Sequence, residues 1–411
     1  MKNKQVERKD KLVLMRHKIV FAALRPFFKL YFKIKYNFSY DKYCGVDKDV
    51  LILSNHATTL DPFFLAASFD FPIYFVASDQ IFNLGFVSRI IKYLVSPIPK
   101  MKGVSDLQTI KDIYAVSKAG GAVGIFPEGN RTFTGKTCNI PDQIGKLVKL
   151  LKKTVVVYNL EGGYLSKPRF SGKVRRGKMV GKIKAVWTIS DYEKLSPDEI
   201  YQNLKKELYV DAYETEKAWD IEYKTSRGAE FLENILYFCP KCKRFHTFKS
   251  RGNFYTCANC GAVVEYTQKG YLKSDDENIP FQTVEEWSTW QNEYIIQNKL
   301  FENHIDKPLI SNNTFKLYKS VRGKKREYVD AGTLSLYSDR YEFDGKDKLI
   351  LKIDEIQDVA PQTMGKIQMY MKNDEMLIFR GDERSYSLSF VTLFYMIKNA
   401  MEGKGNEFLG F

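Results

Sequence analysis

The sequence predicts an α/β fold in which a mixed sheet flanked by helices is followed by a cysteine-rich module and a small β domain ending in a helix. Three features predict it. Short apolar runs alternate with helical stretches between residues 48 and 192, two CxxC pairs lie close together, and residues 313–390 alternate with period two. With 411 residues, the chain is long enough for two or three domains, each with its own core.

The N-terminal segment, residues 1–36, is basic, with 11 lysines and arginines against two acidic residues. Residues 11–36 predict helix, with basic residues recurring every four positions and aromatic residues largely on other faces. Pro26 should either open a second helix or kink one long helix. A basic stripe beside an aromatic face is typical of amphipathic helices at a membrane interface, and we expect that role for residues 1–36. The alternative is a helix packed on the core with solvated lysines.

Residues 37–230 are expected to form the α/β domain. Apolar runs predict strands at residues 50–54, 72–77, 122–126, 154–159 and 184–189. Helical patterns lie between them, at residues 62–70, 80–94, 104–119 and 141–152, and a further helical pattern covers residues 197–231. This alternation predicts one sheet with helices on both faces.

Four of the six cysteines lie in a short module, residues 231–272. Cys239 pairs in sequence with Cys242, and Cys257 with Cys260, with 14 residues between the pairs. This spacing predicts a zinc ribbon, in which four thiolates surround one structural Zn²⁺ and leave no position for water. A redox dithiol is the alternative, but the thioredoxin-like context that it needs is missing. So few cysteines also indicate a reducing, intracellular compartment.

The C-terminal part, residues 273–411, begins with a predicted helix at residues 283–300. Over residues 313–390 the apolar residues recur at every second position, and a helix that ends at Gly403 follows. Several short antiparallel strands capped by one C-terminal helix resemble a PH-like barrel, and this is the fold that we expect.

The first predicted strand leads into a polar segment that contains His56 and Asp61. His56 lies in a loop, and Asp61 with Pro62 opens the next helix. Open α/β sheets place their sites at the carboxyl ends of strands. There a neutral imidazole could take a proton from a hydroxyl group while the carboxylate fixes its tautomer. The alternatives are a loop histidine without a role and an aspartate that only caps the helix.

A second polar segment, with Glu128 and Arg131, directly follows the strand predicted at residues 122–126. The planar guanidinium of Arg131 could hold a phosphate group through two hydrogen bonds. The alternative is a salt bridge between Arg131 and Glu128.

Together the two segments resemble the glycerolipid acyltransferase family, the PlsC-like lysophosphatidic acid acyltransferases. The family motif N-H-x4-D is matched by Asn55, His56 and Asp61. The motif F-P-E-G-T-R-S is matched by Phe126, Pro127, Glu128, Gly129 and Arg131, with Asn130 and Thr132 in place of the usual Thr and Ser. The nearest match to the arginine of the family's middle motif is Lys100. The resemblance covers roughly residues 15–200.

The resemblance implies a 1-acylglycerol-3-phosphate O-acyltransferase of phospholipid synthesis. His56 would act as general base on the free hydroxyl of a lysophosphatidic acid, and Asp61 would orient it. The alkoxide would attack the thioester of acyl-CoA or of an acyl-carrier protein, giving phosphatidic acid. The implied substrate-binding residues are Asn55, Lys100, Glu128, Gly129 and Arg131. Of these, Arg131 and, less strongly, Lys100 would hold phosphate, while Glu128 would position Arg131 or the acceptor. Gly129 would let the backbone approach the substrate.

The net charge of +15 lies entirely in residues 1–270, since residues 271–411 contain 19 basic and 23 acidic residues. This concentration suggests a polyanionic partner, and with the basic N-terminus we expect an anionic membrane surface. The sequence contains no apolar run of the ~18 residues that a membrane span needs. We therefore expect a peripheral protein on the cytoplasmic face of the cell membrane, in a bacterium.

Three alternatives remain open. The cysteine module interleaves basic and aromatic residues, such as Lys243, Phe245 and Phe254, so a zinc-ribbon nucleic-acid-binding protein is the rival hypothesis. We do not expect a nucleic-acid partner, because the two motifs need another explanation. The second alternative is an acyltransferase for another lysophospholipid or for glycerol phosphate. The third is a lipid-binding protein with a lapsed acyltransferase domain.

Overall fold

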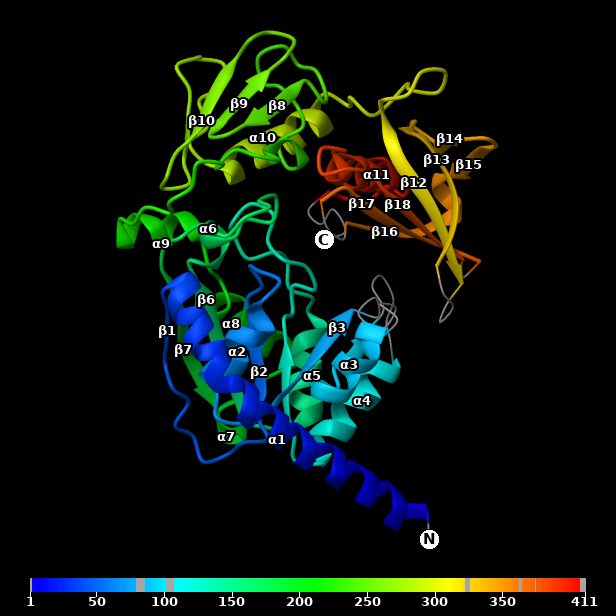
Figure 1. The fold of residues 1–411 in the computed structure, drawn as a ribbon. Coiled ribbons are helices and arrows are strands. Elements are labelled where there is room, and N and C mark those ends of the chain that lie inside the picture. Colours follow the sequence, from blue (N-terminus) through cyan, green and yellow to red (C-terminus); the bar gives the residue numbers. More distant parts are fainter. Residues whose placement is uncertain are drawn as a thin grey trace. The chain divides into compact units, whose positions relative to one another are not determined.

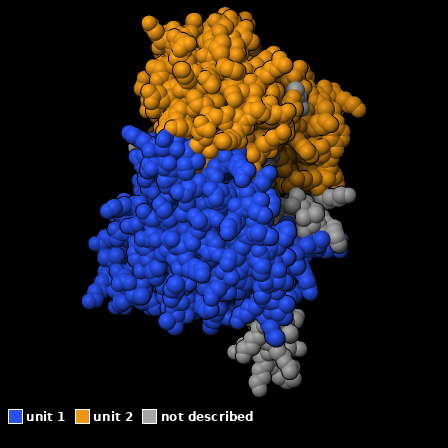
Figure 2. All heavy atoms as spheres, turned by 60° about the vertical axis from the view of Figure 1, so that its left-hand side comes forward, with its two compact units in different colours: residues 1–167, 175–221 blue, residues 168–174, 222–411 orange. Residues whose placement is uncertain are grey.

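The computed structural model describes residues 2–78, 86–100, 107–321, 326–361, 364–373 and 375–406. The chain divides into two compact units (Figure 2). Unit 1 consists of residues 1–167 and 175–221, and unit 2 of residues 168–174 and 222–411. The division expected from the sequence, into residues 1–36, 37–230, 231–272 and 273–411, stays a prediction.

Unit 1 is built on a seven-stranded sheet in the order β1-β7-β6-β2-β5-β3-β4. Its strands are β1 (Phe38–Tyr40), β2 (Leu51–Ser54), β3 (Ile73–Ser78), β4 (Ile98–Lys100), β5 (Ala122–Ile125), β6 (Val155–Glu161) and β7 (Met179–Trp187). Neighbouring strands run parallel, except that β6 and β7 are antiparallel. The expected mixed sheet is therefore confirmed.

Helices cover both faces of this sheet (Figure 1). They are α1 (Lys2–Tyr36), α2 (Asp61–Ser68), α3 (Phe86–Val95), α4 (Leu107–Lys118), α5 (Gln143–Leu151), α6 (Gly163–Ser166), α7 (Ile189–Tyr192), α8 (Pro197–Glu207) and α9 (Ala212–Trp219). Leu53 and Val157 face one core cluster with the apolar residues of α5 and α8. On the other face, the Tyr158 hydroxyl donates a hydrogen bond to Ser68 of α2 at 2.8 Å. Strand β2 is buried along its whole length as a result.

Helix α1 continues through Pro26 as one helix, so no second helix begins there. One of its faces packs on unit 1. The ring of Phe32 stacks on Phe64 of α2 with centroids 4.0 Å apart, and Nδ1 of His17 is hydrogen-bonded to the hydroxyl of Tyr74 at 2.8 Å. In the part of the chain that the structure describes, no helix is both long and apolar enough to cross a membrane.

Two expectations for unit 1 are wrong in their bounds. The helix expected over residues 197–231 is two shorter helices, because α8 ends at Glu207 and α9 ends where Asp220 adopts a left-handed backbone with φ of 52°. Residues 220–231 are not α-helical. Strand β7 begins at Met179 and not at residue 184, since lysines on its more exposed side hide the apolar alternation. The first residues of the helices expected at 80–94 and 104–119 lie outside the described residues.

Unit 2 contains two antiparallel sheets. The four-stranded sheet, in the order β11-β10-β9-β8, consists of β8 (Phe248–Arg251), β9 (Phe254–Cys257), β10 (Val263–Tyr266) and β11 (Leu272–Lys273). The seven-stranded sheet, in the order β15-β14-β13-β12-β18-β17-β16, consists of β12 (Ile310–Val321), β13 (Glu327–Leu336), β14 (Arg340–Asp344), β15 (Lys348–Lys352), β16 (Ile356–Pro361), β17 (Lys366–Met371) and β18 (Glu375–Arg380). The helices of unit 2 are α10 (Val284–Gln297), α11 (Ser387–Met401) and the 3₁₀ helices η2 (Leu232–Asn234) and η3 (Ile353–Glu355).

The seven-stranded sheet and α11 share one hydrophobic core. Its inward-facing positions alternate along the strands, as Leu334 and Leu336 of β13 and Ile367 and Met369 of β17 do, and Phe394 of α11 joins them. The period-two pattern and the C-terminal helix that the sequence predicts are both present. Their assignment to a PH-like barrel, and that of the four-stranded sheet to a zinc ribbon, stay predictions.

Candidate active site

The two polar segments meet because their strands are neighbours. Strand β2 leads into the loop with His56, β5 leads into the turn with Glu128, and the two strands pair in parallel. The carboxyl ends of both strands therefore lie at the same edge of the sheet, where open α/β sheets place their sites.

His56 and Asp61 form a direct hydrogen bond, with 2.8 Å between Nδ1 and Oδ2. The carboxylate of Asp61 is fully buried, whereas the imidazole keeps 19% of its surface exposed. Because a carboxylate accepts at Nδ1, that nitrogen carries the proton and Nε2 is the basic nitrogen of the ring. The ring also stacks on Phe126, with centroids 4.4 Å apart. Its orientation is thus fixed on two sides.

Asp61 is turned toward the loop that precedes it and not toward its own helix. Its Oδ2 accepts the backbone N–H groups of Ala57 and Thr58 at 2.7 and 2.9 Å, and its Oδ1 accepts the hydroxyl of Thr58 at 2.6 Å. The N-cap position of α2 belongs to Leu60, and no side chain caps this helix end. The alternative interpretation of Asp61 as a helix cap is therefore wrong.

Glu128 joins the two segments through the backbone. Its Oε1 accepts the N–H of His56 at 2.6 Å, and its Oε2 accepts the N–H of Cys138 at 2.6 Å. Burial raises the pKa of Glu128 to about 8, although both backbone hydrogen bonds favour the ionised form. The carboxyl group of Glu128 thus holds the His56 loop in place, a contact that sequence reasoning did not anticipate.

Arg131 reaches the first segment through Thr59, to whose hydroxyl its Nη1 donates at 3.0 Å. Burial lowers the pKa of Arg131, and the negative charge of Asp61 opposes this shift. Two residues earlier, Gly129 has a φ of 66°, and an added Cβ would meet no atom within 4 Å. The backbone conformation, and not lack of space, is therefore what favours glycine at this position.

Lys167, which the sequence did not single out, lies near two other cations, Arg131 and Arg175. The pKa of Lys167 is lowered by burial and then by the charges of Arg131 and Arg175. Arg175 is only 1% exposed, and its backbone N–H donates to the carbonyl of Ser166 at 2.8 Å. The only signal in the sequence is the general excess of basic residues over 143–184.

The other two predicted substrate-binding residues occupy different places. The side-chain amide of Asn55 binds the backbone of β6. It donates to the carbonyl of Leu160 at 3.1 Å and accepts the N–H of Leu160 at 2.7 Å. Lys100 is the exposed last residue of β4, and β3 lies between that strand and β5. Substrate binding by either residue stays a prediction.

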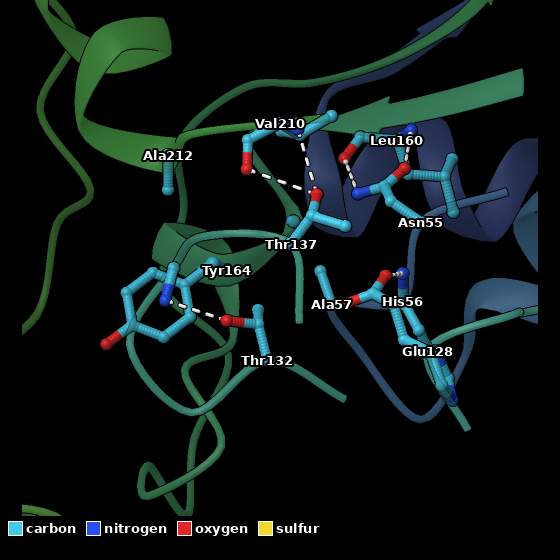
Figure 3. A pocket seen from close by; sticks show the side chains of 13 residues that line it. Asn55, His56, Ala57, Glu128, Thr132, Thr137, Leu160, Tyr164, Val210 and Ala212 are labelled. Atoms are coloured by element: carbon cyan, nitrogen blue, oxygen red, sulfur yellow. Dashed lines mark hydrogen bonds between the residues drawn. The ribbon is translucent and has the colours of Figure 1, made fainter. Parts of the chain in front are cut away.

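A small pocket opens beside the imidazole (Figure 3). Asn55, His56 and Glu128 line it, together with residues that no motif indicates, such as Thr132, Tyr164 and Val210. Val210 comes from the segment between α8 and α9, which is held by its N–H bond to Thr137 Oγ1 at 2.9 Å.

In unit 2, the Sγ atoms of Cys239, Cys242, Cys257 and Cys260 all lie within 4.8 Å of one another. They could hold a metal ion, as the CxxC spacing predicts. Cys239 and Cys257 are buried, which keeps water from one side of the group.

One segment of the chain is similar to a known protein family. Residues 35–159 match the family model described as Acyltransferase. No curated protein matches the chain. Among solved structures, the chain is similar to the 1-acyl-sn-glycerophosphate (LPA) acyltransferase PlsC from Thermotoga maritima, with 17% identity and a TM-score of 0.42 over 49% of this chain and 81% of that chain. The segment that matches the family model includes His56, Asp61, Glu128 and Arg131.

Proposed function

We propose that this protein transfers a fatty acyl chain from acyl-CoA or an acyl-carrier protein to the free hydroxyl of a lysophosphatidic acid, giving phosphatidic acid. The observation that carries the proposal is the 2.8 Å hydrogen bond between His56 and Asp61 inside the segment that matches the acyltransferase family model. It supplies an oriented base with an exposed edge, which is what the activation of a hydroxyl nucleophile needs.

The reaction runs in one ternary complex. Nε2 of His56 takes the proton of the acceptor hydroxyl, while Asp61 stabilises the imidazolium that forms. The oxygen attacks the thioester carbonyl, and the C–S bond then breaks. The leaving thiolate takes the proton from the imidazolium, so that the base is regenerated and no acyl-enzyme is needed.

The phosphate group of the acceptor is assigned to Arg131. The guanidinium lies within hydrogen-bonding distance of Thr59, in the loop between His56 and Asp61. Lys167, which lies near both Arg131 and Arg175, adds positive charge beside it, which supports an anionic acceptor. Lys100 remains a weaker candidate for the same role.

We assign membrane attachment to the outer face of α1. Five of its apolar side chains are 60–67% exposed: Met15, Ile19, Phe27, Leu30 and Ile34. Lysines and arginines are interspersed along the same helix. An apolar strip with basic neighbours binds anionic bilayers peripherally, which supports the cytoplasmic face of the membrane as the place of action.

Zinc is the metal that the cysteine cluster fits best. In a tetrahedral site with Zn–S bonds of about 2.3 Å, two sulfur ligands lie about 3.8 Å apart. The Sγ atoms of Cys239 and Cys260 are 3.8 Å apart, as are those of Cys242 and Cys257. When bound, zinc would brace the fold around these four residues and take no part in acyl transfer.

The rival hypothesis of single-strand binding by the cysteine module needs exposed aromatic rings. Phe248 and Tyr255 are buried and stack on each other with centroids 4.2 Å apart, whereas Phe254 is 53% exposed. Two of the four aromatic residues between residues 245 and 255 are therefore part of the core of the module and cannot stack on bases.

The test is an acylation assay with the full-length protein, labelled lysophosphatidic acid and either acyl-CoA or acyl-carrier protein. Phosphatidic acid should form with at least one donor, and a His56→Ala variant should lower kcat about 10²–10⁴-fold. Lysophosphatidylcholine and glycerol phosphate, as other acceptors, test the second candidate function. A fully active His56→Ala variant would remove the proposed mechanism.

A further inference from the structure

Three cations lie side by side on neighbouring strands of the seven-stranded sheet in unit 2. The strand register places Lys316 of β12 directly opposite Arg380 of β18, and Arg380 directly opposite Lys366 of β17. Directly opposed residues of antiparallel strands project from the same face, with Cβ atoms about 4.5–5.5 Å apart. The three charged groups thus form one row across three strands, where β18 ends and β17 begins.

Their side chains alternate with the core positions of these strands. Leu317, Phe379 and Ile367 are each 2% exposed or less and belong to the core that α11 covers, so the three cations face away from it. Lys316 and Arg380 are exposed, and Lys366 is half-buried.

A fourth cation, Arg326, lies close to the row. Burial and then the charges of Arg326 and Arg380 lower the pKa of Lys366 to about 8. The Nε of Arg326 is buried, and none of the described residues accepts a hydrogen bond from it.

Among the residues that the structure describes, no carboxylate pairs with any of these four cations. Other lysines of the same sheet are paired: Lys319 with Glu375 at 3.3 Å, and Lys348 with Glu342 at 2.9 Å. Like charges directly opposite each other destabilise a sheet. Such a row is stabilised when an anion with several acceptor oxygens binds between the charged groups.

We propose that Lys316, Arg326, Lys366 and Arg380 form a binding site for a phosphate group on unit 2. A phosphate monoester carries a charge of about −1.5 to −2 and three acceptor oxygens, which matches several converging cations better than a single carboxylate does. The phosphate group comes either from a lipid headgroup or from a free anion. This site lies outside the segment that matches the acyltransferase family model and does not depend on the proposed acyl transfer.

The first arm of the test measures thermal unfolding of the full-length protein in inorganic phosphate and in chloride at equal ionic strength. The second arm measures sedimentation with phosphatidylcholine vesicles, with and without phosphatidic acid. The test variant is Lys366→Gln with Arg380→Gln. The control is Lys319→Gln with Lys348→Gln, which removes the same net charge from paired lysines of the same sheet. Helix α1 and the active site offer other contacts for anions, and both variants keep these contacts. Only a difference between the two variants therefore reports on the four cations.

In the phosphate-free buffer at low salt, the test variant should unfold at a temperature no lower than the wild type, because the repulsion is relieved. If the test variant, unlike the control, loses only the phosphate-dependent rise in unfolding temperature, free phosphate is the ligand. If the test variant, unlike the control, loses only the phosphatidic acid-dependent sedimentation, the lipid headgroup is the ligand. If it loses both responses, the site binds the phosphate group from either source. Equal responses of the two variants in both arms would overturn the proposal.

Discussion

The carboxylate of Asp61 accepts four hydrogen bonds, and this decides what a substitution there should do. Asparagine can keep an oxygen where His56 and two backbone N–H groups donate and turn its N–H₂ group toward the Thr58 hydroxyl, but it removes the negative charge that strengthens these hydrogen bonds and stabilises the imidazolium. We expect Asp61→Asn to lower kcat by at least 10²-fold and to lower the free energy of unfolding by about 1–3 kcal/mol. A helix cap would tolerate asparagine at almost no cost. Turnover and chemical denaturation of the same preparation check both, and wild-type turnover would contradict a catalytic role.

Arg131 should affect the acceptor and not the donor. A hydrogen bond to a charged group contributes about 1.5–3 kcal/mol, so Arg131→Ala should raise KM for lysophosphatidic acid about 10–100-fold. Initial rates at varied concentrations of each substrate separate the two KM values. The matched control is Arg176→Ala, because this residue is exposed and its loss changes the net charge equally. A rise in the KM of the donor alone would move Arg131 to the other substrate.

Glu128 makes stability depend on pH. Its pKa is raised from 4.5 to about 8 in the folded state, so the folded state holds the proton more tightly than the unfolded state. The stabilisation is complete below about pH 4.5 and is lost as the pH rises to about 8, by at most ~1.4 kcal/mol per unit. Glu128→Gln should flatten this dependence. It should also lower kcat, because one oxygen no longer accepts an N–H that holds the His56 loop.

Urea unfolding at pH 5, 7 and 9 measures this slope. The control is Glu193→Gln, since Glu193 is an exposed carboxyl group of the same unit. If Glu128→Gln and the wild type lose stability equally between pH 5 and pH 9, the buried carboxyl group is not the cause.

Sequence reasoning found those site residues that lie directly after predicted strands. His56 and Glu128 follow β2 and β5, so an apolar run followed by a polar motif pointed to them, and the resemblance to the acyltransferase family then suggested their roles. It could not find Cys138, because this residue contributes only its backbone N–H. It could not find Lys167, because this residue approaches Arg131 only when distant parts of the chain fold together. It also assigned Asn55 to the substrate, which stays a prediction, and it did not anticipate that the amide of Asn55 holds β6.

At the scale of elements, helix α1 shows why one amphipathic pattern permits two interpretations. Its aromatic residues divide between a face that packs on α2, with Phe32 1% exposed, and a face with Phe27 65% exposed. Both the packed helix and an apolar outer face are therefore present. The sequence pattern could not separate them, because aromatic residues occupy both faces.

This division gives a prediction for membrane binding. Phe27→Glu with Ile34→Glu should weaken partitioning to anionic vesicles at least about tenfold, because charged groups replace the apolar contacts. The fold should persist, since Phe32 and the packed face are unchanged. Vesicle sedimentation measures the effect. The control is Leu150→Glu with Ile350→Glu, which adds the same charge at two exposed apolar residues outside α1. An equal loss of vesicle binding in the control would contradict a specific role for α1.

The longer buried strands were easier to locate than the helix ends, whereas the three-residue strands β1 and β4 were not predicted. Strand β6, for example, is a nearly continuous run of buried apolar residues, and β17 alternates with period two against α11. By contrast, α9 ends because Asp220 adopts a left-handed conformation, which the composition around it does not indicate. The position of a helix end depends on the conformation of one residue, whereas the position of a strand is determined by the pattern of many residues.

At the scale of the whole molecule, the two units are interleaved in sequence. The chain enters unit 2 for residues 168–174, returns to unit 1, and enters unit 2 again at residue 222. Within unit 2, Phe170 packs on Tyr266 with ring centroids 5.9 Å apart, and Arg169 donates to the carbonyl of Pro361 at 3.0 Å. Local patterns divide a chain into contiguous stretches, so such a short excursion could not be predicted from them.

Because the four cysteines of the cluster belong to unit 2, removal of the metal should lower the stability of that unit first. Four thiolates brought within 4.8 Å repel one another unless a cation binds between them, so the metal contributes to folding directly. The protein purified under reducing conditions should contain one zinc ion per chain. A chelator, or Cys260→Ser, should lower the unfolding temperature of unit 2 and leave part of the acyl transfer, because His56 and Asp61 belong to unit 1. Cys44→Ser, at an exposed cysteine outside the cluster, should change neither metal content nor stability. Elemental analysis without zinc, or unchanged unfolding after chelation, would contradict a structural metal site.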